Sequence, residues 1–125
     1  MSLGIVILGH GSRATVGEAN KIAFQVADLV KLQRANDLVE TAIMNRDSGL
    51  QSIDEAVDKL VLAGARQVII APMFLANGMH IRSDIPTEIS EIQAKYPQIV
   101  IKMATHIGAD QRIADILVER IEAVL

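Results

Sequence analysis

Hydrophobic positions along the chain form short continuous runs that alternate with helical stripes. Four runs have the length of buried strands, and glycines bound the first of them. The predicted strands are Ile5–Leu8, Val39–Met44, Gln67–Pro72 and Gln98–Ala104. Because apolar residues are continuous in these runs rather than alternating with polar ones, the pattern is typical of strands covered on both faces.

Each predicted strand is followed by an amphipathic segment with helical spacing. The first predicted helix spans Gly17–Ala35, and its apolar face is Ile22, Ala23, Val26, Leu29 and Val30. The second begins at a capping box over Ser52–Glu55, in which the serine and glutamate side chains satisfy each other's backbone amides. It ends before Gly64, because glycine readily adopts the left-handed conformation that stops a helix.

Two further helices complete the pattern. The third is expected to begin at Asp84–Pro86, with Asp84 as its cap, because proline is well tolerated in a first helical turn. The long segment before it, which carries His80, is expected to be a loop. Asp110 is expected to cap the last helix, whose apolar stripe is Ile113, Ile116, Leu117, Ile121 and Val124.

The resulting order, βαβαβαβα, predicts an α/β fold. Alternating strands and helices favour a four-stranded parallel sheet with helices on both faces, a flavodoxin-like half-unit. At roughly 150 residues per domain, 125 residues form a single domain over 1–125.

Composition excludes several classes of function. The net charge is −3 and only 2% of residues are aromatic, so we expect no nucleic-acid partner. The absence of cysteine removes disulfides, thiol catalysis and thiolate metal sites. The apolar runs are too short to span a membrane and no signal-like segment is evident, so we expect a cytoplasmic protein.

All three histidines follow the ends of predicted strands. Because ligands of open α/β sheets bind beyond the carboxyl ends of the strands, this edge is the expected functional site. His10 lies between two glycines, His80 lies in the long segment after the third strand, and His106 follows the fourth. Two imidazoles form an incomplete metal site, as transfer or catalytic sites do, and nitrogen ligands suit cobalt, nickel, iron and zinc.

Three arginines are expected at the same edge. Arg13, Arg46 and Arg82 would favour an anionic ligand, because guanidinium groups bind carboxylates and phosphates with paired hydrogen bonds. A competing interpretation is a dinucleotide-binding loop, since Gly9–Ala14 matches the G-x-G-x-x-A pattern after a first strand. Against it, only four strands are predicted, and a histidine at the second position would crowd a pyrophosphate.

Taken together, the motifs resemble a known enzyme family. The run Leu8–Arg13, then Ala71–Leu75, Gly78–His80 and Asp84–Pro86, is similar to the short-form sirohydrochlorin cobaltochelatases, members of the class II tetrapyrrole chelatases. The likeness covers nearly the whole chain. The paired motifs at this distance are specific, whereas the first motif alone would be weak.

The resemblance implies an activity and an assembly. The chain would be half of the two-lobed chelatase architecture, completed as a homodimer. It would insert a divalent metal into sirohydrochlorin without ATP, as in cobalamin-type tetrapyrrole biosynthesis. Cobalt(II) is the expected metal substrate, with nickel(II) or iron(II) as alternatives, and no organic cofactor is expected.

The resemblance also implies roles for individual residues. His10 and His80 would be the metal-binding and catalytic pair. The positions expected beside the tetrapyrrole are Gly11, Ser12, Arg13, Arg46, Gly78, Met79 and Arg82.

One segment departs from the family pattern. Asn45 stands where the family commonly has a glutamate, and an amide cannot act as a base. Asp47 could substitute as proton acceptor, and His106 could stabilise the site without itself contacting the metal or the tetrapyrrole. Because of this departure, an alternative function is that of a carrier, which would bind metal or tetrapyrrole without catalysing insertion.

Overall fold

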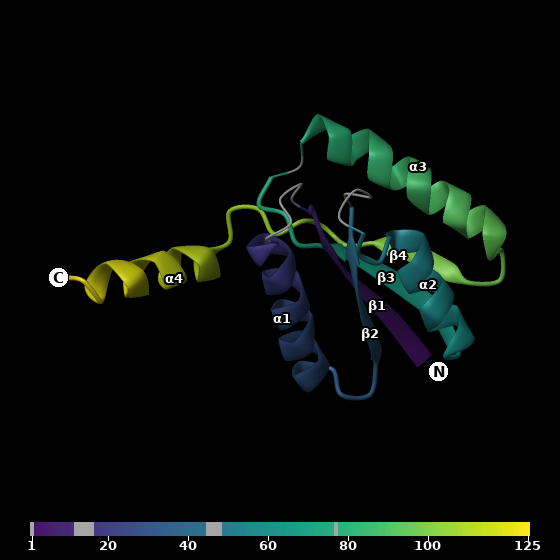
Figure 1. Ribbon diagram of the computed structural model, residues 1–125, viewed down its shortest axis with the longest axis horizontal. Coiled ribbons are helices and arrows are strands. Elements are labelled where there is room, and N and C mark those ends of the chain that lie inside the picture. Colours follow the sequence, from purple (N-terminus) through teal and green to yellow (C-terminus); the bar gives the residue numbers. More distant parts are fainter. Residues whose placement is uncertain (1, 12–16, 45–48, 77) are drawn as a thin grey trace.

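The computed structural model describes residues 2–11, 17–44, 49–76 and 78–125, and it has the predicted alternation of strands and helices (Figure 1). The elements are β1 (Ser2–Gly9), α1 (Glu18–Gln33), β2 (Leu38–Ile43), α2 (Ile53–Leu62), β3 (Ala65–Pro72), α3 (Met79–Lys95), β4 (Val100–Met103) and α4 (Gln111–Glu122).

The strands form one parallel sheet in the order β2-β1-β3-β4. The register pairs Ile5 of β1 with Val39 of β2 and with Ile69 of β3, and Ile69 in turn with Lys102 of β4. The prediction of a four-stranded parallel sheet is therefore confirmed. β1 and β3 are the two central strands of the sheet, and β2 and β4 are its edge strands.

One face of the sheet is covered by α1, which packs through small residues. Ala23 and Ala27 are buried, whereas Ile22 and Leu29 are 45% and 58% exposed, so the expectation that these two face the core is wrong. The reason is the short distance between helix and sheet. A Cβ atom at Gly9 would lie 3.1 Å from the Ala23 Cβ, which leaves no room for larger side chains at the contact.

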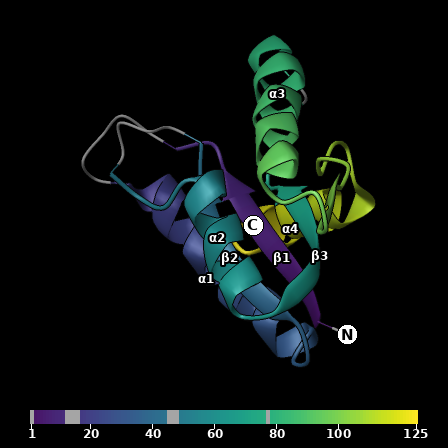
Figure 2. The same ribbon diagram turned by 90° about the vertical axis from the view of Figure 1, so that its right-hand side faces the viewer.

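The opposite face is covered by α2 and α3, and Figure 2 looks onto this side. The larger core cluster lies here and joins both helices to β1 and β3. Its fully buried large side chains are Val6, Leu8, Ile53, Val57, Leu60, Val68, Ile70 and Ile85.

The predicted limits of α2 are confirmed. The Ser52 side chain accepts a hydrogen bond from the Glu55 amide, and the Glu55 carboxylate accepts one from the Ser52 amide, each at 3.2 Å. Gly64, just beyond the helix, has a φ of +102°, as a stop in the left-handed region requires.

The predicted cap of α3 is wrong by six residues. The helix begins at Met79 with Gly78 at the N-cap position, so Asp84 is not a cap and Pro86 lies inside the helix. Proline removes only one helical hydrogen bond, and Pro86 is on the exposed side, where the carbonyl that loses its partner can be hydrated. The helix therefore takes in His80, which was expected in a loop.

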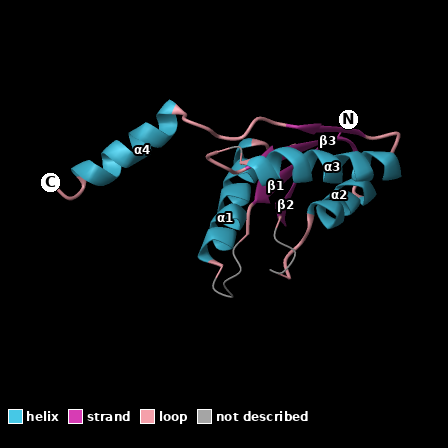
Figure 3. Ribbon diagram, turned by 90° about the horizontal axis from the view of Figure 1, so that it is seen from above, coloured by secondary structure: helices cyan, strands magenta, loops and turns pink. Residues whose placement is uncertain are grey.

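The last helix differs most from expectation. Asp110 caps α4 by accepting a hydrogen bond from the Arg112 amide, as predicted, but no described residue of the helix is buried. Figures 1 and 3 show α4 extending away from the sheet instead of covering it. Among the described residues, no helix is both long and apolar enough to cross a membrane.

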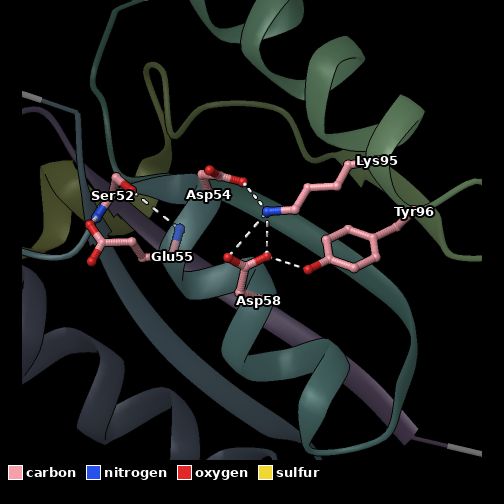
Figure 4. A network of polar contacts seen from close by, with 6 residues as sticks. All are labelled: Ser52, Asp54, Glu55, Asp58, Lys95 and Tyr96. Atoms are coloured by element: carbon pink, nitrogen blue, oxygen red, sulfur yellow. Dashed lines mark hydrogen bonds and ion pairs between the residues drawn. The ribbon is translucent and has the colours of Figure 1, made fainter.

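A polar cluster ties α2 to the end of α3 (Figure 4). Asp58 accepts hydrogen bonds from the Tyr96 hydroxyl and from Lys95 Nζ, the latter at 3.0 Å, and Lys95 Nζ also lies 3.4 Å from an Asp54 oxygen. The Tyr96 hydrogen bond, assisted by Lys95, outweighs the effect of burial and lowers the pKa of the Asp58 carboxyl below its ordinary value of 3.8.

Replacing Tyr96 with phenylalanine should destabilise the fold by about 1 kcal/mol at neutral pH, because Asp58 loses a hydrogen bond. A carboxyl whose pKa is lowered by folding adds stability above its ordinary pKa and loses it as the pH falls through the folded value. The difference between wild type and Tyr96→Phe in urea unfolding should therefore narrow below pH 3.8. A difference that stays constant with pH would contradict this account.

Candidate functional site

The segments that follow β1, β2 and β3 are joined by backbone hydrogen bonds beyond the ends of the paired strands. The Met44 amide donates to the Gly9 carbonyl at 2.9 Å, and the Met73 amide donates to the Leu8 carbonyl at 2.8 Å. These bonds bring the chain after β1, after β2 and after β3 to one edge. The edge that the sequence predicted as the functional site is therefore a joined structural unit.

His10 is the first residue beyond β1, and its side chain is exposed. Its Nδ1 atom lies 3.1 Å from the Gly11 carbonyl oxygen. A carbonyl only accepts hydrogen bonds, so Nδ1 carries a proton, and in the neutral ring Nε2 then has the lone pair. Neutral imidazole with a free Nε2 is the form that binds a metal ion or accepts a proton.

Gly11 makes this arrangement possible. Its φ of +89° lies in the left-handed region, which glycine adopts without strain and other residues rarely do. The turn at Gly11 follows His10 directly and presents the carbonyl that orients the imidazole. The glycine beside the histidine is thus required by the backbone.

Phe74, two residues beyond the end of β3, supports the imidazole. The two rings meet edge to face, with centroids 5.9 Å apart and planes at 76°. Phe74 is buried in the same core cluster as Ile85 of α3. The position of His10 is therefore coupled to the packing of α3. Sequence reasoning assigned Phe74 no role, because only the fold brings residues 10 and 74 together.

The N-terminus of α3 follows Phe74 by a short connection. Gly78 precedes the helix without a side-chain cap, and its carbonyl accepts the Arg82 amide at 3.1 Å. The structure places the backbone of His80 and of Met79 in the first turn. Backbone amides at a helix N-terminus attract anions, so this end of α3 suits a ligand that carries carboxylates.

His106 lies at the same edge, in the connection after β4. Its Nε2 atom lies close to Gly108, 3.8 Å from where a Cβ atom of that residue would be. The neighbouring Ile107 amide donates to the Phe74 carbonyl at 2.9 Å, which ties this connection to the His10 side of the edge. Among the described residues, however, no three His, Asp or Glu side chains are grouped as a metal site.

Several predicted site residues lie outside the part of the chain that the structure describes. They are Ser12, Arg13, Asn45, Arg46 and Asp47. Of the three arginines expected at the edge, Arg82 is described, and its side chain is exposed in α3.

A cavity of about 410 Å³ lies between the end of β2 and one flank of α3. It is lined by Met44, Ser83, Asp84, Thr87, Glu88 and Glu91. The three carboxylates among these residues would repel a ligand that is itself rich in carboxylates. This cavity is therefore distinct in charge from the expected site of an anionic substrate.

Comparisons with known proteins agree with this architecture. Residues 4–124 match the family model described as CbiX. The chain is 38% identical over 122 residues to the sirohydrochlorin cobaltochelatase of Sulfurisphaera tokodaii, covering 98% of this chain and 93% of that protein.

Two solved structures superpose on nearly all of the chain. SirB from Bacillus subtilis with Fe3+ matches at 25% identity and a TM-score of 0.86, over 99% of this chain and 48% of SirB. The chain thus spans about half the length of SirB. A CbiX protein from Marinobacter aquaeolei VT8, described as a putative cobalamin biosynthesis protein, matches at 28% identity and a TM-score of 0.76, over 97% and 98% of the two chains. The chain belongs to the CbiX family.

Proposed function

We propose that this protein is a sirohydrochlorin chelatase, which inserts a divalent metal, cobalt(II) foremost, into the tetrapyrrole without ATP. The observation that carries the proposal is the state of His10: an exposed imidazole at the carboxyl edge, oriented through Nδ1 and open at Nε2. The relative from Sulfurisphaera tokodaii, which is named for this reaction, supports the choice of substrate.

The chemistry of the reaction fits one or two exposed imidazoles better than a closed site. A macrocycle takes up a metal slowly, because its ring must distort and two pyrrole protons must leave. A metal held by few exchangeable ligands can pass to the ring one bond at a time. An imidazole with an ordinary pKa of about 6.5 can also accept a pyrrole proton near neutral pH.

Positioning is the second contribution of the edge. In the proposal, His10 and His80 hold the metal, while the N-terminus of α3 and the arginines bind the carboxylates of the ring. Holding metal and ring face to face removes the entropy cost of their encounter. Gly11 and Gly78, which have no side chains, let the macrocycle approach the backbone closely.

The choice of metal is tested by comparing ions directly. The structural relative SirB is described with Fe3+, and nickel shares the preference for nitrogen ligands, so iron and nickel are the competing substrates. Purified protein is mixed anaerobically with sirohydrochlorin and cobalt(II), nickel(II) or iron(II), and the visible spectrum is followed. We expect protein-dependent insertion that is fastest with cobalt. The absence of acceleration with every metal would contradict the proposal.

We further propose that the chain acts as a homodimer in the cytoplasm. The match to about half of SirB supports the dimer, because a second copy would supply the other half. Sedimentation of the purified protein tests the dimer, and cell fractionation tests the location. Neither nucleic acid nor a membrane has a role in the proposed reaction.

The conformation of Gly11 gives a prediction for both stability and activity. Gly11→Ala should cost about 1–2 kcal/mol of unfolding free energy, because alanine is strained at a φ of +89°. The rate of metal insertion should fall as well, since the carbonyl that orients His10 would shift. Urea unfolding and initial rates measure the two effects.

Gly64→Ala is the matched control. Gly64 also has a positive φ, and no atom lies within 4 Å of the added Cβ, but it is at the opposite edge of the sheet. A similar loss of stability with an unchanged insertion rate is expected. If Gly64→Ala slowed insertion as much as Gly11→Ala, the effect of Gly11 would be one of stability alone.

A further inference from the structure

α4 carries an apolar side that no described residue of its own chain buries. Residues at helical spacing, Ile113, Leu117, Ile121 and Val124, line this side, and Leu117 and Ile121 are 58% and 57% exposed. Arg112, Asp115 and Glu119 lie elsewhere around the helix. Such an amphipathic pattern is typical of a helix that packs against another surface.

The sheet has an uncovered area on the side of α1. The smaller core cluster joins α1 to β1 and β2 through Ile5 and Val39. The register places Ile69 beside Ile5, and Val100 beside Gln67, so Ile69 and Val100 share this face farther along the sheet. Val100 is 50% exposed. The face over β3 and β4 thus presents Ile69 and Val100 together with the polar Gln67 and Lys102, and α4 points away from it (Figure 3).

The connection before α4 fixes this direction. The Ile107 amide is bound to the Phe74 carbonyl, and Gly108 turns the chain with a φ of +65°. Asp110 then starts the helix by binding the Arg112 amide and side chain. α4 therefore extends away from the uncovered face of its own sheet.

The exposed surface has the size of an interface. A folded monomer of 13.5 kDa is expected to expose about 6,500 Å². This chain exposes 8332 Å², about 1,800 Å² more. A stable pair of proteins buries about 800 Å² on each partner. The excess is more than enough for a dimer in which each copy covers the other.

The match to SirB argues for a second copy of this chain as the occupant. The match covers 99% of this chain, so it takes in α4 as well as the sheet. About half of the SirB chain lies beyond the match. A second copy of this chain could provide the surface that the longer chain contains.

We propose that two copies exchange α4, each placing the Leu117 side of the helix on the partner's uncovered face over β3 and β4. The pairing is reciprocal, as two-fold symmetry requires, because each copy offers one helix and receives one. This inference rests on the proposed homodimer and not on metal insertion, so its tests use the protein without sirohydrochlorin.

The first test compares the same substitution at two exposed leucines. Leu117→Glu should weaken the dimer by on the order of 30-fold or more in sedimentation, because a carboxylate would be buried in the contact. Leu62→Glu, on α2 and 88% exposed, should leave the dimer unchanged. Unchanged urea unfolding of the Leu117→Glu monomer is also expected, since α4 has no buried residue. Equal dimer affinity for wild type and Leu117→Glu would overturn the proposal, as would a monomeric wild type.

The second test locates α4 by cross-linking. Because the chain has no native cysteine, only the introduced cysteines can react. Chains carrying Leu117→Cys and chains carrying Val100→Cys are co-expressed and treated with a short bismaleimide. We expect a cross-linked heterodimer, and an intermolecular product from chains that carry both substitutions. An intramolecular product would show that α4 folds back on its own sheet. Efficient linkage of Leu117→Cys chains to one another alone would show that α4 packs on α4. Either result would overturn the exchange.

Discussion

Replacing His10 with alanine should abolish the protein's acceleration of cobalt insertion, with a loss of at least about 100-fold in rate. The imidazole is the exposed group whose Nε2 can bind the incoming metal or accept a pyrrole proton. His80→Ala should have a similar effect if both imidazoles hold the metal. The initial rate of spectral change in sirohydrochlorin with cobalt(II) measures each loss.

His106→Ala is the control for this result. His106 lies at the same edge, but its ring is next to Gly108. We expect this variant to keep most of the wild-type rate. The His10→Ala fold should be intact, because the side chain is exposed. A His10→Ala protein that inserts cobalt at the wild-type rate would refute the role assigned to this residue.

Ile85→Ala should destabilise the protein by about 3 kcal/mol, within the range for deleting a fully buried isoleucine side chain. Ile85 is 0% exposed and anchors the first half of α3 in the cluster that contains Phe74. Because His80 lies one turn earlier in α3 and His10 rests on Phe74, insertion should slow as well. Urea unfolding measures the loss of stability. Initial rates, taken under conditions in which the variant is folded, measure the loss of activity.

Ile92→Ala offers a matched comparison in the same helix. Ile92 is 3% exposed and belongs to the same cluster, but it lies nearly two turns farther from the carboxyl edge. A comparable loss of stability with a smaller loss of rate is expected. If both variants slowed insertion equally, the coupling between Ile85 and the site would be disproved.

The start of α3 shows why part of the site was difficult to predict. Local signals at residues 84–86, an aspartate followed by a proline, resemble a helix start, yet Gly78 precedes the helix and Pro86 is inside it. Ile85 packs in the core with residues far apart in the sequence, and no local pattern at residues 84–86 shows that the helix already begins at Met79. By contrast, the capping box at Ser52 is a local device and was predicted correctly.

The two outer helices illustrate the same limit. Periodicity gave α1 and α4 apolar stripes, but it does not state which surface a stripe meets. In α1, close packing at Gly9 selects Ala23 and excludes Ile22. In α4, no residue of the stripe is buried by the part of the chain that the structure describes. An apolar stripe at helical spacing looks the same in the sequence whether it packs in the core of its own chain or against another molecule. Periodicity alone therefore does not distinguish the two.

The edge at which these candidate residues gather was predictable, because the carboxyl ends of parallel strands meet by topology. His10 and His106 lie there, and the backbone of His80 opens α3. The orientation of the His10 ring was not predictable, since it depends on the positive φ of Gly11 and on the edge of Phe74.

The most direct test of chelatase function is a count of turnovers. Protein is mixed with a large excess of sirohydrochlorin and cobalt(II) over chains, under anaerobic conditions, and the cobalt product is measured after correction for the reaction without protein. The account predicts many equivalents of product per chain at a constant initial rate. Product that stops at one equivalent per chain, or a rate no greater than without protein, would show a carrier instead of an enzyme.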